Sequence, residues 1–412
     1  MARFAPWLLV ALCCVLAVAS RSIGDTFAVF VPDLQNGFAA SRSAVTVIYS
    51  FALLAGGTGA PLAGWIADRF GLGALTVTGM IAAALGTLAA WQASELWQLY
   101  AGLGILLGFG GTCVSGVLSS LLLSRWFPVR RLGVAMAVAW SASGVGAMLM
   151  IPLAQYLIAA DGWRHAYLVF AMVSAACVPL LLVLPWRRIA AGATGDRGAP
   201  APLMSGLGGK RSQTGPTVAE AVRDWPFWAL TCSFGLTSLG IFAVAPQSVV
   251  YLMEHGIDAA YAARAVAVAG FLTPLGMVGF SWLADRGGRK IAAILAYGCS
   301  IAGIGALALV GGPADSLFIW AYVLLFGGSQ GSRGPMISTL ATLRYRGAHF
   351  GKIYGLISIG TGIGGFLGAW VGGLLHDLTD GYGAVMVFAA LALVAAALTL
   401  GAEARARERL SR

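Results

Sequence analysis

The feature that most constrains this chain is a series of about twelve apolar windows, each close to the ~20 residues that a helix needs to cross a bilayer. The windows are centred roughly on residues 18, 55, 83, 110, 145, 175, 238, 273, 301, 328, 364 and 392. Of the 412 residues, 59% are hydrophobic and only 10% are charged, whereas roughly a quarter of a soluble domain is charged. We therefore predict an all-α membrane protein with twelve transmembrane helices.

A short cassette of Asp, Arg, any residue and Gly occurs twice, almost half a chain length apart. The copies are Asp68-Arg69-Phe70-Gly71 and Asp285-Arg286-Gly287-Gly288. At an offset one residue larger, three glycines of one half match three of the other, namely Gly133, Gly144 and Gly146 with Gly351, Gly362 and Gly364. Repeats on this scale are how secondary transporters are built.

The repeat predicts two pseudo-symmetric six-helix halves, at residues 1–186 and 225–402. Between them, residues 187–224 are rich in Gly, Pro and Ser and predict a flexible cytoplasmic linker. The charged residues 403–412 predict a cytoplasmic tail.

The basic residues indicate how the chain is oriented, because short loops rich in Lys and Arg stay on the cytoplasmic side. With a cytoplasmic N-terminus, most of the 26 basic residues lie inside, and only Arg42, Arg164 and Arg264 lie outside. Arginine far outnumbers lysine, which favours a bacterial genome rich in G and C. We expect a multi-pass bacterial inner-membrane protein with both termini cytoplasmic. The net charge of +10 is then a topology signal, and no single basic face indicates nucleic-acid binding.

The first apolar stretch ends in a run of small residues, 17–20, that could pass for a signal-peptide cleavage site. Cleavage there would leave an odd number of spans and break the symmetry of the halves. We expect the first helix to be retained.

The two cassettes lie in longer segments that carry a family resemblance. These are Gly64-Trp65-Ile66-Ala67-Asp68-Arg69-Phe70-Gly71, between spans two and three, and Ser281-Trp282-Leu283-Ala284-Asp285-Arg286-Gly287-Gly288-Arg289-Lys290, between spans eight and nine. Both resemble the signature loop of the major facilitator superfamily. The first copy lacks the trailing basic pair, and the second has Ser281 in place of the leading glycine. The resemblance implies a twelve-helix transporter with a cytoplasmic gate, formed by Asp68, Arg69, Asp285 and Arg286.

A narrower resemblance runs through both halves. Arg-Trp-Phe-Pro at 125–128, Gly-Trp-Arg at 162–164, the segment 350–355 and Asp-Leu-Thr at 377–379 are similar to bacterial members of the monocarboxylate porter and oxalate:formate antiporter group. In that group an arginine in span eight commonly grips a carboxylate, and in oxalate carriers a lysine in span eleven does so. Alignment places Met277 and Thr361 at those positions, so both anchors are missing. The glycine-proline motif of drug exporters is not evident in span five, which disfavours export.

Two arginines fall inside predicted spans, where a charge costs at least ~2.5 kcal/mol and normally faces a cavity or a partner. They are Arg21 in span one and Arg333 in span ten. The resemblance implies that these spans line the central cavity, so we expect both guanidinium groups to bind the substrate. Guanidinium suits a carboxylate through paired hydrogen bonds and also stacks on flat rings. For Arg333 the alternative is a side chain that snorkels to the interface.

Five further residues complete the predicted site. Asp25 lies one helical turn after Arg21, and it either orients that arginine through an ion pair or acts as the proton-coupling switch. Polar or aromatic groups in otherwise apolar spans are expected to line the cavity, with helix packing as the alternative; they are Trp140, Gln247, Gln330 and Tyr354.

Other chemistries find little support in the motifs. A G-x-G-x-x-G string starts at Gly360, but it lies inside a predicted span, so its glycine face indicates close helix packing. A P-loop string is absent, and the four histidines lack the spacing of metal ligands. We expect no enzyme activity, no cofactor and no metal ion.

The leading hypothesis is proton-coupled uptake of a small organic anion such as a monocarboxylate, by alternating access. A flat or neutral nutrient, for example riboflavin, is the alternative that the missing anchors favour, and a non-transporting sensor on the same scaffold is another. The expected partners are a small-molecule substrate and membrane lipid, with a monomer as the working form.

Overall fold

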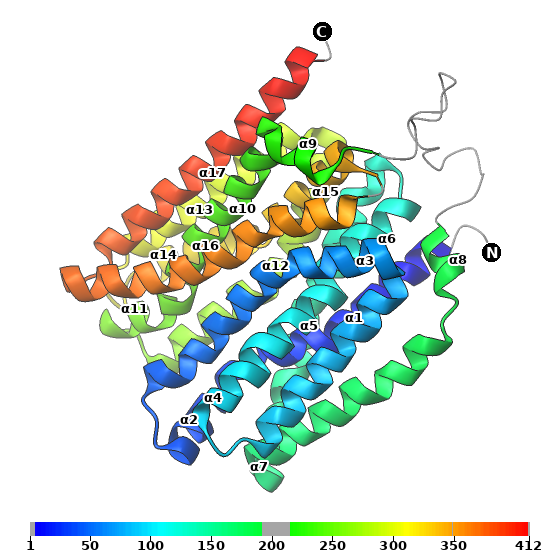
Figure 1. Cartoon of the computed structure of the whole chain (residues 1–412). Helices are drawn as coiled ribbons and strands as arrows, with labels where there is room; N and C mark the ends of the chain where they lie inside the picture. Colours follow the sequence, from blue (N-terminus) through cyan, green and yellow to red (C-terminus); the bar gives the residue numbers. More distant parts are fainter. Residues whose placement is uncertain (1–4, 192–214, 348, 411–412) are drawn as a thin grey trace, which may run out of the picture. The chain divides into compact units, whose positions relative to one another are not determined.

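A computed structural model describes the chain at residues 5–191, 215–347 and 349–410, and no strand occurs within these ranges. Eight of their helices are long and apolar enough to cross a membrane, and two shorter apolar helices, Pro6–Ser20 and Ser316–Gly327, add to them. Two of the eight, Ala44–Gln92 and Arg130–Val183, are each long enough for two spans. The described helices account for the twelve predicted spans, which confirms the all-α membrane fold (Figure 1).

The helices form two compact units. The first comprises Met1–Val218 with Thr342–Leu356, and the second comprises Ala219–Ala341 with Ile357–Arg412. The predicted boundaries of the halves and of the tail stay a prediction. Residues 192–214 of the predicted linker lie outside the described residues, and its described ends form the short helices α8 (Trp186–Ala191) and α9 (Val218–Arg223).

The first unit is built from α1 to α8. Before α8 its helices are α1 (Ala5–Asp25), α2 (Phe27–Phe38), α3 (Arg42–Gln92), α4 (Leu96–Leu99), η1 (Tyr100–Leu107), α5 (Gly108–Thr112), η2 (Cys113–Val117), α6 (Leu118–Trp126) and α7 (Val129–Val183). The segments η1 and η2 are π-helical turns within one continuous span, and such turns recur at functional sites.

The second unit follows from α9. Its other helices are α10 (Trp225–Val244), η3 (Ala245–Gln247), α11 (Ser248–Glu254), α12 (Ala259–Gly287), α13 (Arg289–Ala308), α14 (Ser316–Tyr322), η4 (Val323–Gly327), α15 (Arg333–Tyr345), α16 (Phe350–Thr379) and α17 (Gly383–Leu410). The last residues of α15 and the first of α16 group with the first unit. Another π-helical turn, η4, lies in the span that matches the η1 span in the repeat.

Glycines with left-handed backbone divide the longest helices. Gly71 breaks α3 at φ 89°, and Gly162 breaks α7 at φ 82°. Gly288 has φ 99° between α12 and α13. Residues with a side chain rarely adopt this conformation. The last glycine of each D-R-x-G cassette therefore has the same physical task, which is to end one span and let the next begin.

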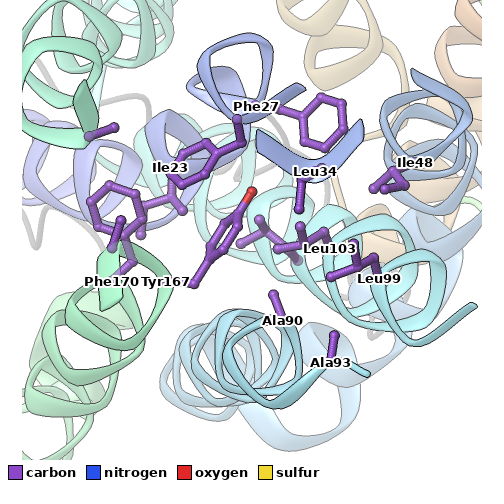
Figure 2. Close-up of a cluster of buried hydrophobic side chains, with 14 of the residues drawn as sticks. Ile23, Phe27, Leu34, Ile48, Ala90, Ala93, Leu99, Leu103, Tyr167 and Phe170 are labelled. Carbon is purple, nitrogen blue, oxygen red and sulfur yellow. The ribbon is translucent and has the colours of Figure 1, made fainter. Parts of the chain in front are cut away.

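The core of the first unit lies where α1, α2, α3, η1 and α7 meet (Figure 2). Phe30 and Tyr167 stack there with ring centroids 4.3 Å apart. Ile23, Leu103 and Phe170 are buried in the same cluster. This packing fixes the helices that surround the cavity described below.

In the second unit, the glycine face of α16 packs against the backbone of α10, as predicted. A Cβ added on this face would overlap carbonyl oxygens of α10: Gly360 would meet Thr231, Gly364 would meet Gly235, and Gly368 would meet Leu239. Small residues are what let two membrane helices approach this closely.

Candidate functional site

A small cavity lies in the first unit. Helices α1, α2, α3, η1, α5 and α7 contribute to its wall. Most lining residues are apolar or glycine. The polar ones are Ser20, Asp25, Tyr49 and Tyr167. The cavity therefore combines apolar walls with a few polar side chains.

Asp25 lines this cavity at a break in the first span. Helix α1 ends at Asp25, and α2 begins at Phe27. Between them, the Thr26 hydroxyl donates to the carbonyl of Ile23 at 2.7 Å. The break sets the carboxyl group at a helix end beside the cavity. Arg21 belongs to α1, but its side chain lies outside the described residues, so its predicted ion pair with Asp25 stays a prediction.

Ser20, Tyr49 and Tyr167 were not predicted as site residues. The Ser20 hydroxyl is fully buried and has no hydrogen-bond partner among the described residues. Figure 2 shows the Tyr167 hydroxyl pointing toward Phe27 and Leu34. A serine in an apolar span carries no distinctive pattern, because most such hydroxyls are satisfied within their own helix, and a tyrosine there is a common packing residue. Only the cavity identifies all three, and for Ser20 the missing partner adds to it.

Arg333 lies in the second unit and is fully buried. Its Nη1 donates to the carbonyl of Ala296 at 2.9 Å and to the Ser300 hydroxyl at 2.8 Å, and its Nη2 donates to the carbonyl of Gln330 at 3.1 Å. The guanidinium also lies 5.0 Å from the centre of the Tyr297 ring, while its Nε has no partner. Arg333 therefore ties the start of α15 to α13, and it is not among the residues that line the Asp25 cavity.

Gln330 belongs to the same network as Arg333. Its side-chain amide donates to the Thr273 hydroxyl of α12 at 2.8 Å, and that hydroxyl lies 3.0 Å from the carbonyl of Gly327. The structure thus brings two predicted site residues, Arg333 and Gln330, into one set of interhelical hydrogen bonds.

The other predicted wall residues are not among those that line the Asp25 cavity. Trp140 is half-buried and its indole N–H has no partner. Gln247 lines a smaller cavity of about 190 Å³ in the second unit, with Tyr251 and Tyr382. Tyr354 is buried, with its ring 5.8 Å from that of Phe350.

Asp68 contacts the start of α16 within the first unit. Its Oδ1 accepts from the backbone N–H of Gly351 at 3.1 Å, and its Oδ2 accepts from that of Lys352 at 2.9 Å. A carboxylate at a helix N-terminus satisfies N–H groups that have no partner within the helix and complements the helix dipole. Gly64 allows this approach, because a Cβ there would overlap the Gly351 carbonyl.

Two cationic side chains close to this contact in the sequence have partners of their own. Arg346, between α15 and α16, donates to the carbonyl of Ser124. Burial, and then the positive charge of Arg125, lower the pKa of the Arg346 guanidinium. Arg69 is exposed and lies 5.7 Å from the centre of the Phe70 ring.

The second cassette has a comparable local geometry. Arg286 is exposed and lies 4.7 Å from the centre of the Trp282 ring, and Asp285 is half-buried. In the part of the chain that the structure describes, no three His, Cys, Asp or Glu residues are grouped so that they could hold a metal ion.

Comparison with known proteins agrees with this architecture. Residues 10–349 match the family model of the Major Facilitator Superfamily. Monocarboxylate transporter 13 of Bos taurus is 29% identical over 377 residues, which covers 90% of this chain and 82% of the relative. An uncharacterised MFS-type transporter of Bacillus subtilis, YcxA, is 23% identical, with 91% of this chain and 90% of the relative covered.

A crystal structure of the E. coli fucose:proton symporter superposes with a TM-score of 0.69 at 16% identity, covering 96% of this chain and 98% of that one. At this identity the likeness shows the fold alone. The family model, the paired cassettes and the twelve spans agree, and the chain therefore belongs to the major facilitator superfamily of membrane transporters.

Proposed function

We propose that the protein takes up a small monocarboxylate together with a proton by alternating access. The observation that carries this proposal is the cavity of the first unit, where one carboxyl group, Asp25, meets neutral hydroxyls and apolar walls. The similarity to monocarboxylate transporter 13 of Bos taurus, which aligns with 90% of the chain, supports the substrate class.

Asp25 supplies the coupling in this proposal. An ionised Asp25 repels a carboxylate, whereas a protonated Asp25 can donate a hydrogen bond to it. Binding of the proton and binding of the anion then favour each other, as two linked ligands must. Arg21, one turn earlier in α1, is the proposed cationic partner of the carboxylates. Arg333 has a different role in this scheme, because its buried contacts favour holding α15 on α13.

The gate is proposed at Asp68, Arg69, Asp285 and Arg286. Asp68 holds the start of α16 through two backbone N–H groups, and release of this contact would let α16 move during transport. We place the protein in a bacterial inner membrane as a monomer with both termini cytoplasmic, surrounded by lipid. It needs no cofactor or nucleic acid in this role and catalyses no reaction.

The test is uptake of labelled acetate, propionate and pyruvate into proteoliposomes that contain the purified protein. An inside-alkaline pH gradient should accelerate uptake. Asp25→Asn should abolish the response to the gradient while counterflow persists, and Asp33→Asn, outside the cavity, should behave as the unchanged protein.

Uptake that ignores the gradient would reject proton coupling. Absence of counterflow with all three acids would reject the substrate class. Riboflavin counterflow would then favour the neutral-nutrient alternative, and no counterflow of either kind would favour the sensor.

A further inference from the structure

Hydroxyl side chains inside helices normally donate to a carbonyl three or four residues earlier. Buried examples in this chain are Thr76 to Leu72, Thr87 to Ala83, Ser124 to Leu121 and Thr339 to Pro335. Ser20 of α1 does not follow this hydrogen-bonding pattern. Its Oγ is buried without any hydrogen-bond partner, and the residue lines the Asp25 cavity. A buried donor in this situation is unfavourable until an acceptor arrives.

Tyr167 of α7 lines the same cavity and is only 2% exposed. Its ring is fixed by the stack on Phe30 and by an edge contact with Trp163, at 6.3 Å between centroids. Its hydroxyl makes no hydrogen bond among the described residues. A rigid ring thus presents a polar tip to the cavity without a protein acceptor.

The two hydroxyls come from different helices and meet at one cavity. Gly24, one turn after Ser20, adds no side chain, and a Cβ there would meet no atom within 4 Å. Room is therefore left beside Ser20 for a ligand. A carboxylate has about four lone-pair sites on two oxygens, so one carboxylate can accept from two hydroxyls at once.

We propose that the Ser20 and Tyr167 hydroxyls form a clamp that holds the carboxylate of the substrate through neutral hydrogen bonds. This inference rests on the proposed function and names the groups that recognise its substrate. The clamp gives the carboxylate an anchor although Met277 and Thr361 stand where related carriers place cations. Because both donors are uncharged, the clamp leaves the charge of the anion to Arg21, the proposed cationic partner, and the coupled proton to Asp25.

Two variants remove only the hydroxyl groups. Ser20→Ala and Tyr167→Phe each keep the packing volume, and Tyr167→Phe keeps the ring that stacks on Phe30. Ser281→Ala is the matched control, because the Ser281 Oγ of α12 is also buried without a partner but belongs to the second unit. Kd for propionate is measured by calorimetry on purified protein, and KM and maximal rate by propionate uptake into proteoliposomes.

Each clamp variant is expected to raise Kd and KM for propionate about tenfold with little change in maximal rate, since each removes a hydrogen bond to a charged group. Ser281→Ala should leave all values unchanged, and the double variant should bind propionate too weakly to measure.

Normal propionate affinity in Ser20→Ala and Tyr167→Phe, with normal uptake by the unchanged protein, would overturn the clamp and leave the proposed function standing. Equal losses in Ser20→Ala and Ser281→Ala would also overturn the clamp, because they would reflect packing. Failure of the unchanged protein to take up acetate, propionate and pyruvate would instead reject the proposed function.

Discussion

Arg333 is the charged side chain that the structure buries most completely among the described residues. It stays charged because backbone carbonyls, a serine hydroxyl and the face of Tyr297 replace the water that it lost. A substitution at this position removes these contacts whatever the solute is. Loss of uptake in such a variant would therefore say nothing about the substrate's charge unless stability is measured beside it.

We predict that Arg333→Gln lowers the unfolding temperature and abolishes uptake of anionic and neutral solutes alike. Each buried acceptor left unpaired costs about 1–3 kcal/mol. Thermal unfolding in detergent measures the effect. Arg264→Gln is the control, because Arg264 is exposed and its Nε donates only to Ala260 of its own helix. An unchanged unfolding temperature for Arg333→Gln would contradict this structural role and favour direct contact between Arg333 and the substrate.

The roles of some single residues could be predicted from the sequence, and those of others could not. The cost of a charge in an apolar span singled out Arg21 and Arg333, and Asp25 was predicted from its place one turn after Arg21. Asp25 does line a cavity. The sequence does not predict the hydrogen-bond partners of Arg333, because Ala296 and Gln330 contribute backbone carbonyls, a group that every residue has. Ser20 was out of reach because a missing hydrogen bond leaves no trace in a sequence.

Among the elements, the start of α16 depends on a side chain of another helix. Asp68 uses both oxygens to accept from Gly351 and Lys352. An asparagine has one acceptor oxygen, and its amide would face an N–H group. The contact is thus sensitive to a change of one atom, which suits a gate that has to open and close.

We predict that Asp68→Asn slows uptake severalfold while the KM for substrate changes little, since a cap of this kind is worth about 1 kcal/mol. Asp258→Asn is the control: Asp258 caps α12 through the backbone N–H of Tyr261, and asparagine caps a helix about as well. Initial uptake rates of Asp68→Asn, Asp258→Asn and the unchanged protein are compared in proteoliposomes at matched protein content. Unchanged transport by Asp68→Asn would remove Asp68 from the gate.

The close packing between α10 and α16 depends on the absence of a side chain at Gly364. Gly364→Ala should destabilise the protein by about 1–3 kcal/mol, because the added methyl group overlaps the Gly235 carbonyl. Gly373→Ala, on the same helix, adds its methyl group where no atom lies within 4 Å and should be neutral or stabilising. Thermal unfolding compares the two. Equal unfolding temperatures would mean that the helices can separate at no cost.

Hydropathy predicted that the membrane-spanning helices exist, but it did not predict where they break or change to π-helical turns. The apolar windows predicted the spans because length and lack of charge decide whether a helix crosses a bilayer. The division of the first span at Thr26, and the π-helical turns of η1, η2 and η4, arise from packing between helices that a single window does not contain. The glycine break at Gly71 carries a visible sequence signal, since its counterpart Gly288 ends the second cassette.

At the scale of the whole molecule, the repeat predicted two six-helix halves, whereas contacts group Thr342–Leu356 with the first unit. The reason is visible in Asp68, Gly64 and Arg346, whose contacts join this segment to α3 and α6. These contacts join a segment from the second half of the sequence to helices of the first half, and the internal repeat does not predict them. Together the repeat and the basic residues predict one orientation of the chain, which can be tested.

The orientation prediction uses two exposed positions of the first unit. Ser94 lies in the connection between α3 and α4, and Arg130 lies at the start of α7. If both termini are cytoplasmic, successive connections alternate sides, so residue 94 faces the periplasm and residue 130 faces the cytoplasm. A membrane-impermeant maleimide added to spheroplasts should label Ser94→Cys strongly, and Arg130→Cys only after lysis. The unchanged protein, whose six cysteines all lie within helices, sets the background. Labelling of Arg130→Cys in intact spheroplasts, with Ser94→Cys protected until lysis, would invert the proposed topology and the side on which Asp68 gates.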